Sequence, residues 1–149
     1  NKLSLNIRKT NCNACSKYIQ PLVIIQKRAI RCICNLRKRR STSDSFKSTN
    51  ILRLLDLYKY SVCIFMYKYK SADIPRIFED FFEYNWQYHS YNTRQKQKFH
   101  VPKVSSEIRK SFIKFSGVQL WNSLPAALND SKLKLHKFKK TLKCYFLSF

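Results

Sequence analysis

The chain has 149 residues, and its 30 Lys and Arg outnumber its 8 Asp and Glu, so its formal net charge is +22. This length predicts one domain, or a domain plus a tail, with a modest core, and the hydrophobic fraction of 44% excludes a purely disordered basic tail. The single Gly excludes the phosphate-binding loops of nucleotide-binding folds, because those loops need several glycines. No run of about 18 apolar residues occurs, so the sequence predicts no transmembrane helix.

The start of the chain and its cysteines bear on where the protein works. The chain begins at Asn1 and its only Met is Met66, so we expect a fragment of a longer translation product. No signal peptide is recognisable, and the six Cys accompany a large excess of Lys. We therefore expect reduced thiols and an intracellular location, in the nucleus or the cytoplasm.

The charge is concentrated in two arms. Residues 1–40 hold eleven basic and no acidic residues, residues 41–95 hold seven basic and six acidic ones, and residues 96–149 hold twelve and two. Such a field attracts polyanions, of which nucleic acid is the commonest and acidic lipid headgroups are the competitor. The alternative is an ordinary solvated surface.

In chain order, residues 1–18 predict a basic loop or a severed element. Residues 20–33 then predict a helix with Pro21 at its first position, where a missing N–H has no partner to lose. The spacing of three and four residues predicts one apolar face, made of Leu22, Ile25, Ala29 and Ile33. This helix should end before the basic run 37–40 and the turn cluster that follows it.

Two further helices are predicted in the centre of the chain. The first covers residues 50–69 with Asn50 or Asp56 as its cap, although the aromatic segment 62–66 also suits a strand. The second covers residues 73–82, capped by Asp73. Its expected buried side consists of Ile74, Ile77, Phe78, Phe81 and Phe82.

The last third of the chain starts with an extended basic connection at residues 84–111. Residues 112–121 follow as an apolar segment that Gly117 interrupts and Pro125 ends. Residues 131–147 then predict an amphipathic helix, because apolar residues recur at helical spacing among many lysines. Its stripe is Leu135, Phe138, Leu142 and either Tyr145 or Phe146.

These elements predict a mainly α fold, a small helical domain with basic arms, and they leave open one short β-hairpin around residues 97–116. The expected division is a basic loop or severed element at 1–18, a helical region at 19–83, an extended basic connection at 84–111 and a C-terminal helical region at 112–149.

Candidate catalytic groups are few. Glu79 and Asp80 are adjacent acids with Glu83 one turn later, and we expect them to form a solvated face rather than a two-metal centre. The three histidines show no pairing on one helix face: His89, His100 and His136. Nothing in the sequence favours a Ser-His-Asp or Cys-His arrangement.

Four cysteines have the composition of a zinc site. Cys12 and Cys15 form one pair, and Cys32 and Cys34 form another. The second pair lies two residues apart on a predicted helix and therefore faces apart, so free thiols are the preferred interpretation. No cofactor and no metal ion are expected in this chain.

Basic and aromatic side chains alternate in the segment Tyr88–His100. Arg and Lys can bind phosphates there while Tyr or His stacks on bases, although the segment could also be an ordinary loop. With the run at 37–40 and the Lys face of the last helix, it supplies the candidate nucleic-acid-binding residues: Arg37, Lys38, Arg39, Arg40, Arg94, Lys96, Lys98, Lys137, Lys139, Lys140 and Lys143.

Several segments together resemble a known family. They are residues 21–31, 57–60 with 65–69, Tyr91-Asn92-Thr93-Arg94, Leu120-Trp121-Asn122-Ser123-Leu124-Pro125 and the helix around 138–143. In order and approximate separation, over about residues 19–147, they resemble the region that follows the polymerase domain in reverse transcriptases of non-LTR (LINE-type) retrotransposons.

The resemblance implies a C-terminal piece of an RNA-directed DNA polymerase that copies element RNA at a nicked DNA target. It does not imply catalysis by this piece, because the family's aromatic-Ala-Asp-Asp turn has no counterpart here: no Asp-Asp pair occurs in the chain. We expect a non-catalytic accessory segment that binds the phosphate backbone of RNA and DNA and associates with the polymerase domain of its parent, without membrane contact. The alternatives are a structural or protein-interaction helical module, or a degenerate transposon fragment with no activity. For Trp121 and Leu124 we expect a core position, and for Asn122 and Pro125 a role in a turn.

Overall fold

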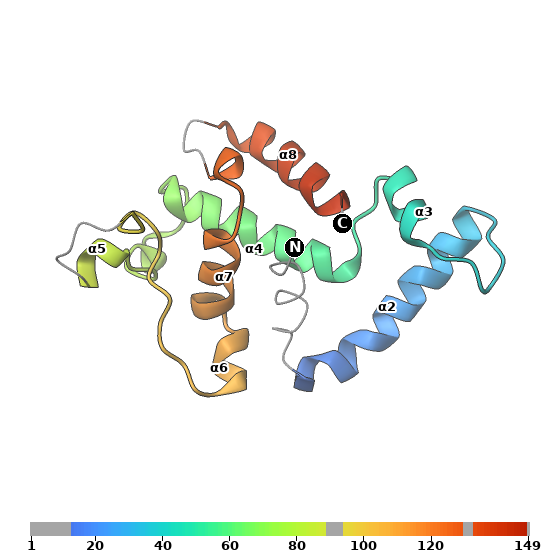
Figure 1. Ribbon diagram of the computed structural model, residues 1–149, viewed down its shortest axis with the longest axis horizontal. Coiled ribbons are helices and arrows are strands. Elements are labelled where there is room, and N and C mark those ends of the chain that lie inside the picture. Colours follow the sequence, from blue (N-terminus) through green and yellow to red (C-terminus); the bar gives the residue numbers. More distant parts are fainter. Residues whose placement is uncertain (1–12, 89–93, 130–132, 149) are drawn as a thin grey trace. The chain divides into compact units, whose positions relative to one another are not determined.

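Figure 1 shows the computed structural model, which describes residues 13–88, 94–129 and 133–148, with side chains from Tyr18 onward. The described chain is mainly helical, as the periodicity predicts. None of its described helices is both long and apolar enough to cross a membrane. The helices are α2 (Asn13–Ile33), α3 (Ser43–Ser48), α4 (Leu54–Lys70), α5 (Asn85–Tyr88), α6 (Glu107–Ser111), α7 (Ile113–Asn122) and α8 (Leu135–Leu147), with two short 3-10 helices, η1 (Arg76–Phe78) and η2 (Ala126–Leu128).

The described chain divides into two compact units. The central unit contains Val62–Leu133, and the terminal unit contains Asn13–Ser61 and Lys134–Phe149. Helix α4 runs through both, so its first half belongs to the terminal unit and its second half to the central one. This division differs from the four consecutive segments expected from the sequence.

Helix α2 starts earlier than expected. It begins at Asn13, so Pro21 lies inside the helix and the prediction of a first-turn proline is wrong. Residues 13–18, expected to be loop or severed element, are helical, and residues 1–12 lie outside the described residues.

The face of α2 that is buried is not the one that the sequence favoured. Leu22, Ile25 and Ile33 are 54, 58 and 66% exposed, whereas Ile30 is buried. The covered stripe consists of Ile19, Val23, Gln26 and Ile30. Because α2 carries apolar residues on two adjoining faces, spacing alone could not select between them.

Gln26, the polar member of the covered stripe, fixes the start of α4. Its Nε2 donates to the Leu52 carbonyl at 2.9 Å, and its Oε1 accepts the Leu54 amide at 2.9 Å. The first amides of a helix have no partner within the helix, so this side chain supplies one from a different helix. The cap positions expected from sequence are wrong, since Asn50 lies in the turn that ends α3 and Asp56 lies inside α4 beside Lys59.

Three helices end on a left-handed residue that is not glycine. Asn35, Asn50 and Ala72 have φ values of 48°, 54° and 53°. After α4, the Asp73 amide bonds to the Lys68 carbonyl at 2.9 Å, and the Ala72 amide bonds to the carbonyl of Tyr69 at 3.1 Å. The same pair of bonds follows α2 and α3, which identifies three Schellman motifs.

Aromatic rings form the core of the central unit. Phe82 and Phe99 are 5 and 2% exposed, and the Phe82 ring meets the ring of Tyr69 edge to face at 4.8 Å. The predicted helix over 73–82 is wrong, because the chain there forms only η1, and Ile77 is 85% exposed. The Tyr69 hydroxyl accepts the Phe82 amide at 3.2 Å and lies 2.7 Å from the Glu79 carbonyl, so it pairs backbone groups that a helix would have paired internally.

Gly117 does not interrupt a helix but lies inside α7. A Cβ at this position would lie 2.9 Å from Ile113 Cγ1 and 3.4 Å from Val62 Cγ1. The tightest contact is therefore within α7 itself, and the side chains of α4 lie at van der Waals distance from this position. Trp121, near the end of α7, is 3% exposed, which confirms its expected core position.

Leu124 and Pro125, which follow α7, lie as the sequence predicts, whereas Asn122, expected in a turn, is the last residue of α7. Leu124 is buried at 7% exposure, and Pro125 immediately precedes η2. The Asn122 Nδ2 donates to the Phe99 carbonyl at 2.8 Å, which fastens the end of α7 to a distant segment.

The region 97–116 does not form a β-hairpin. Phe99 makes a single antiparallel bridge with Tyr84, and α6 and the start of α7 occupy the second half of the region. The backbone near Phe99 forms hydrogen bonds with residues earlier in the chain: the His100 amide donates to the Glu83 carbonyl at 2.8 Å. The expected extended connection at 84–111 accordingly contains both α5 and α6.

Helix α8 matches its prediction most closely. Phe138, Leu142 and Phe146 are 0, 0 and 6% exposed, as the apolar stripe requires. The helix begins at Leu135, and residues 130–132 lie outside the described residues. At its C-terminus the Lys47 Nζ donates to the Ser148 carbonyl at 3.1 Å, where a positive charge is favourable to the helix dipole.

Candidate nucleic-acid interface

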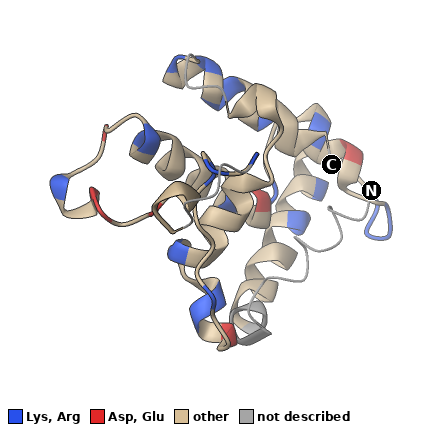
Figure 2. Ribbon diagram, turned by 60° about the vertical axis from the view of Figure 1, so that its left-hand side comes forward, with Lys and Arg blue, Asp and Glu red and all other residues tan. Residues whose placement is uncertain are grey.

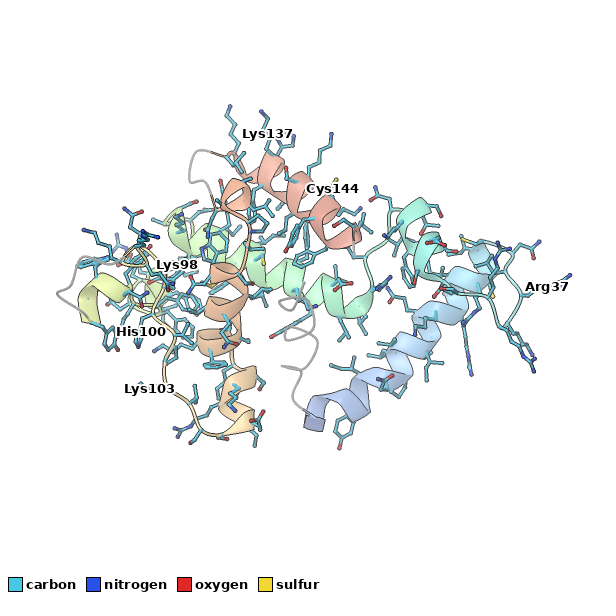
Figure 3. The ribbon with its side chains drawn as sticks, in the orientation of Figure 1. Arg37, Lys98, His100, Lys103, Lys137 and Cys144 are labelled. Carbon is cyan, nitrogen blue, oxygen red and sulfur yellow. The ribbon has the colours of Figure 1, made fainter. Side chains whose placement is uncertain are left out.

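The basic run 37–40 forms the turn between α2 and α3. A hydrogen bond of 3.0 Å from the Arg40 amide to the Arg37 carbonyl closes the turn, and all four side chains are exposed. Figure 3 shows Arg37 projecting from it. Guanidinium and ammonium groups that are exposed in this way are available to bind phosphate oxygens.

The lysines of α8 lie opposite its buried stripe. Lys137, Lys139 and Lys140 are exposed and Lys143 is half-buried. Figure 3 shows Lys137 extending away from the helix. Residues 131–149 include no Asp or Glu, so the lysine face of α8 has no acidic neighbour on its own helix.

The third basic set lies in the central unit, in a turn that we call the basic turn (residues 94–98). Arg94, Lys96 and Lys98 are all exposed there. The structure therefore places the sets at 37–40 and on α8 in the terminal unit, and the basic turn in the central unit.

Helix α5 holds the basic turn through its backbone. The amides of Asn85 and Trp86 donate to the carbonyls of Lys98 and Lys96 at 3.0 and 3.2 Å, and the Asn85 Nδ2 donates to the Gln95 carbonyl at 2.9 Å. The carbonyl groups of the turn face α5, and the charged side chains of the turn are exposed to solvent. Figure 3 shows Lys98 beside α5.

Two ring stacks accompany this turn. The rings of Tyr88 and His100 are stacked at 3.8 Å and 16°, so two of the rings that the sequence offered for base stacking contact each other, and His89 and Tyr91 lie outside the described residues. The second stack runs from Phe99 to Tyr84 at 4.7 Å and on to Trp86 at 6.4 Å. Trp86 is 57% exposed, and the sequence analysis missed it. The sequence feature that could have pointed to Trp86 is its place in residues 84–106, a stretch that contains four Lys and Arg and no acid.

Three of the described acids pair with lysines outside the three basic sets. Asp56 lies 3.4 Å from Lys59, Asp73 lies 3.7 Å from Lys68, and Glu107 lies 2.5 Å from Lys110. Among the described residues, none of the eleven candidates has an ion pair with a carboxylate. Figure 2 shows the resulting picture, in which basic positions recur along the ribbon and acidic ones are sparse.

Two tyrosines near the basic turn are held in the neutral form. A hydrogen bond to the Glu83 carboxylate raises the pKa of Tyr88, with smaller contributions from desolvation and from the charge of Glu83. Burial, followed by the influence of Tyr69, raises the pKa of Tyr84. Neither phenol adds negative charge beside the basic turn near neutral pH, so both are compatible with a bound polyanion.

The acids and histidines considered for catalysis can be located in the described part of the chain, except His89. Glu79, Asp80 and Glu83 are exposed, as expected for a solvated acidic face. Among the described residues no three His, Cys, Asp or Glu side chains gather in a group that could hold a metal ion. His136 is exposed on α8, and His89 lies outside the described residues.

The proposed zinc ligands are only partly described. Cys32 is exposed on α2 and Cys34 lies half-buried just beyond its end, both as thiols. Cys12 and the Cys15 side chain lie outside the described residues, so the preference for free thiols over a zinc site stays a prediction. Residues 91–93 of the Tyr91–Arg94 motif lie outside them too.

Comparisons with known protein families, with curated proteins and with solved structures find no match to this chain. Its function must therefore be inferred from its own residues and their arrangement.

Proposed function

We propose that this chain binds the phosphate backbone of RNA and DNA without reading base sequence, as a non-catalytic accessory segment of a non-LTR retrotransposon reverse transcriptase. The observation that carries the proposal is the availability of the charge. Ten of the eleven candidate Lys and Arg side chains are exposed, the half-buried Lys143 being the exception, and within the described chain none is neutralised by a carboxylate.

Phosphate contacts of this kind give a defined physical signature. Each phosphate neutralised by Lys or Arg releases condensed counterions, so affinity falls as salt rises. Side chains on flexible stems at a helix face and in two turns can follow a backbone, but they present no fixed pattern of donors to base edges. Sequence preference is therefore expected to be weak.

The link to a reverse transcriptase rests on the residue resemblance over about residues 19–147. In that setting the segment acts inside the cell, in the nucleus or the cytoplasm, beside the polymerase domain of its parent. Catalysis belongs to that domain, and metal-dependent primer extension by this chain alone is expected to be absent.

The test is equilibrium binding of the full chain to a single-stranded RNA and to a DNA duplex across a salt series. With six or more phosphate contacts, affinity should fall by about 10³-fold or more between about 50 and 200 mM salt. Binding that does not change with salt, or no binding at low salt, contradicts the proposal.

A structural or protein-interaction module, or a degenerate fragment, is the second candidate, and one observation favours an interaction surface. Helix α2 exposes several large apolar side chains, Tyr18, Leu22, Ile24, Ile25 and Ile33, at 79, 54, 47, 58 and 66%. Four of them, Tyr18, Leu22, Ile25 and Ile33, recur at helical spacing on one side of α2, which is typical of a protein contact, and the polymerase domain of the parent is its natural partner. Thermal unfolding discriminates: cooperative melting indicates an independent domain, whereas an aggregating or non-cooperative chain indicates a severed piece.

A further inference from the structure

We infer that the basic turn, α5 and Trp86 form a site for single-stranded nucleic acid, in which an unpaired base stacks on the Trp86 indole. This inference rests on the proposed function and deepens it, because it names the class of nucleic acid that the central unit selects and the side chain that selects it.

The first step is the exposure of Trp86. Trp86 lies on a four-residue helix and is 57% exposed, so much of its indole surface is open to a ligand. The other Trp of the chain, Trp121, is 3% exposed and belongs to the core.

The second step is the orientation of the ring. Tyr84 and Trp86 are nearly parallel, with an interplanar angle of 18°, and Tyr84 lies at 23° to Phe99, which is 2% exposed. Trp86 is thus the outer member of a stack that begins in the core. A nucleobase placed on the indole would continue this stack.

The third step is that the support is rigid. The Gln87 Oε1 accepts the Tyr84 amide at 2.6 Å, in the manner of a capping box. The Trp86 amide is itself bonded to the Lys96 carbonyl at 3.2 Å. The backbone that carries the ring is therefore held in place before any ligand arrives, which reduces the entropy cost of binding.

The fourth step is the charge beside the ring. Arg94, Lys96 and Lys98 are exposed in the turn that α5 holds, and Lys103 follows, also exposed. Glu83 is the acid at the edge of this region, and within the described chain it has no ion pair with a basic side chain of the turn. A ring with phosphate-binding groups next to it matches the general design of single-strand sites, in which backbone charge gives affinity and stacking tolerates any base.

A single strand is favoured over a duplex because only an unpaired base has a free face for the indole. In a duplex the bases are stacked on each other, and the Lys and Arg of the turn could still bind the backbone while Trp86 contributes nothing. Trp86 should therefore separate the two ligands, whereas charge alone should not.

The test uses the full chain, a single-stranded oligouridine and a DNA duplex with the same number of phosphates. Trp86→Ala should weaken single-strand binding by about tenfold, the effect of one stacked base, and change duplex binding by less than about twofold. Trp86→Phe should restore most of the loss, because it keeps a ring. Ile77→Ala is the matched control, since Ile77 is an exposed apolar residue of the same unit, at 85%, and its loss should change neither affinity.

Tryptophan fluorescence gives an independent readout. Oligouridine should quench the emission of the unmodified chain, and Trp86→Phe, which leaves only Trp121, should abolish the quenching. Equal losses for both ligands, or no quenching, overturn the inference. So does stronger binding to anionic phospholipid vesicles than to oligouridine with a blue shift of Trp86 emission, which would make the ring a membrane contact.

The outcomes also separate this inference from the proposed function. If the unmodified chain binds neither nucleic acid at low salt, the proposed function fails. If it binds both in a salt-dependent way and Trp86→Ala changes nothing, only the single-strand site is wrong.

Discussion

The lysine face of α8 and the basic turn are both positively charged, but the residues around the charges differ. On α8 the lysines recur along one helix whose other face carries the buried Phe138, Leu142 and Phe146. At the basic turn, three charges stand beside Trp86, which ends a ring stack that reaches Phe99. Charged side chains alone bind any polyanion, whereas charged side chains beside an exposed ring can distinguish an unpaired base from a paired one.

The two units also differ in how their backbones are fastened. In the terminal unit, Gln26 makes two hydrogen bonds across 26 and 28 residues of sequence and so joins α2 to the start of α4. In the central unit, Asn122 makes one such bond, to Phe99, and its Oδ1 is buried without a partner in the described structure. Tyr69 adds a hydroxyl that pairs the backbone around Phe82. Long-range polar contacts in the central unit thus include those of Asn122 and Tyr69, and in the terminal unit those of Gln26 and Lys47.

The largest expected effect comes from removing charge. Replacing Lys137, Lys139 and Lys140 by Gln should lower affinity for single strands and duplexes alike, by about 10²-fold at about 0.1 M salt, because three counterion-releasing contacts are lost. Replacing Arg94, Lys96 and Lys98 by Gln should weaken binding of both ligands, and of single strands more, because a single strand that loses these phosphate contacts also loses its base from Trp86. Salt titrations of both triple variants measure the two losses.

The paired lysines provide a matched control for these variants. Lys59, Lys68 and Lys110 each lie within 4.0 Å of a carboxylate. Changing these three to Gln removes the same formal charge, but the slope of affinity against salt should stay the same. If this control lowers affinity as much as the α8 variant, net charge rather than the α8 surface binds nucleic acid. If both triple variants affect single strands and duplexes equally, the two basic regions do not differ in the way described.

A second prediction compares the two amide side chains. Gln26→Leu leaves the Leu52 carbonyl and the Leu54 amide without their partner and should lower the free energy of unfolding by about 2 kcal/mol. Asn122→Leu loses one bond but also removes the unpartnered Oδ1, so its cost should be smaller, about 1 kcal/mol. Urea unfolding measures both.

Gln119 serves as the reference for this pair. It is an exposed glutamine on α7, so Gln119→Leu should change stability by no more than about 0.5 kcal/mol. A cost for Asn122→Leu that equals or exceeds the cost for Gln26→Leu would show that the doubly bonded amide is not the stronger fastening.

The sequence predicts those elements whose apolar residues form a single stripe. α8 has one such stripe among lysines, and α4 is found nearly where residues 50–69 predicted it. In α2 two apolar faces adjoin, and Gln26 decides which of them is covered. It does so by hydrogen bonds to backbone groups of Leu52 and Leu54, which no local sequence pattern around α2 reveals. The same holds for residues 73–82, where a hydroxyl from Tyr69 competes with helix formation.

The candidate site shows the same limit. Exposed charge could be predicted, because Lys and Arg without nearby acids have no reason to be buried. The role of Trp86 could not, because it depends on the rings of Tyr84 and Phe99 being brought together by a bridge between residues far apart in sequence. From the sequence, Tyr88 and His100 were equally suitable for stacking on a base, but in the structure their rings stack on each other.

The smallest expected effect concerns the helix ends, where the two units differ once more. The terminal unit ends α2 and α3 on asparagines, which tolerate the left-handed conformation, whereas the central unit ends α4 on Ala72 at φ 53°. Ala72→Gly relieves that conformation but gives the unfolded chain more freedom, so the net gain in unfolding free energy should be about 0.5–1 kcal/mol. Asn50→Gly, made at the equivalent position after α3, should gain only a few tenths of a kcal/mol, because Asn already pays less for this conformation. Urea midpoints of the two variants decide the matter: equal gains would mean that Asn and Ala are strained alike, and a loss on Ala72→Gly would mean that the flexibility added to the unfolded chain outweighs the strain removed from the end of α4.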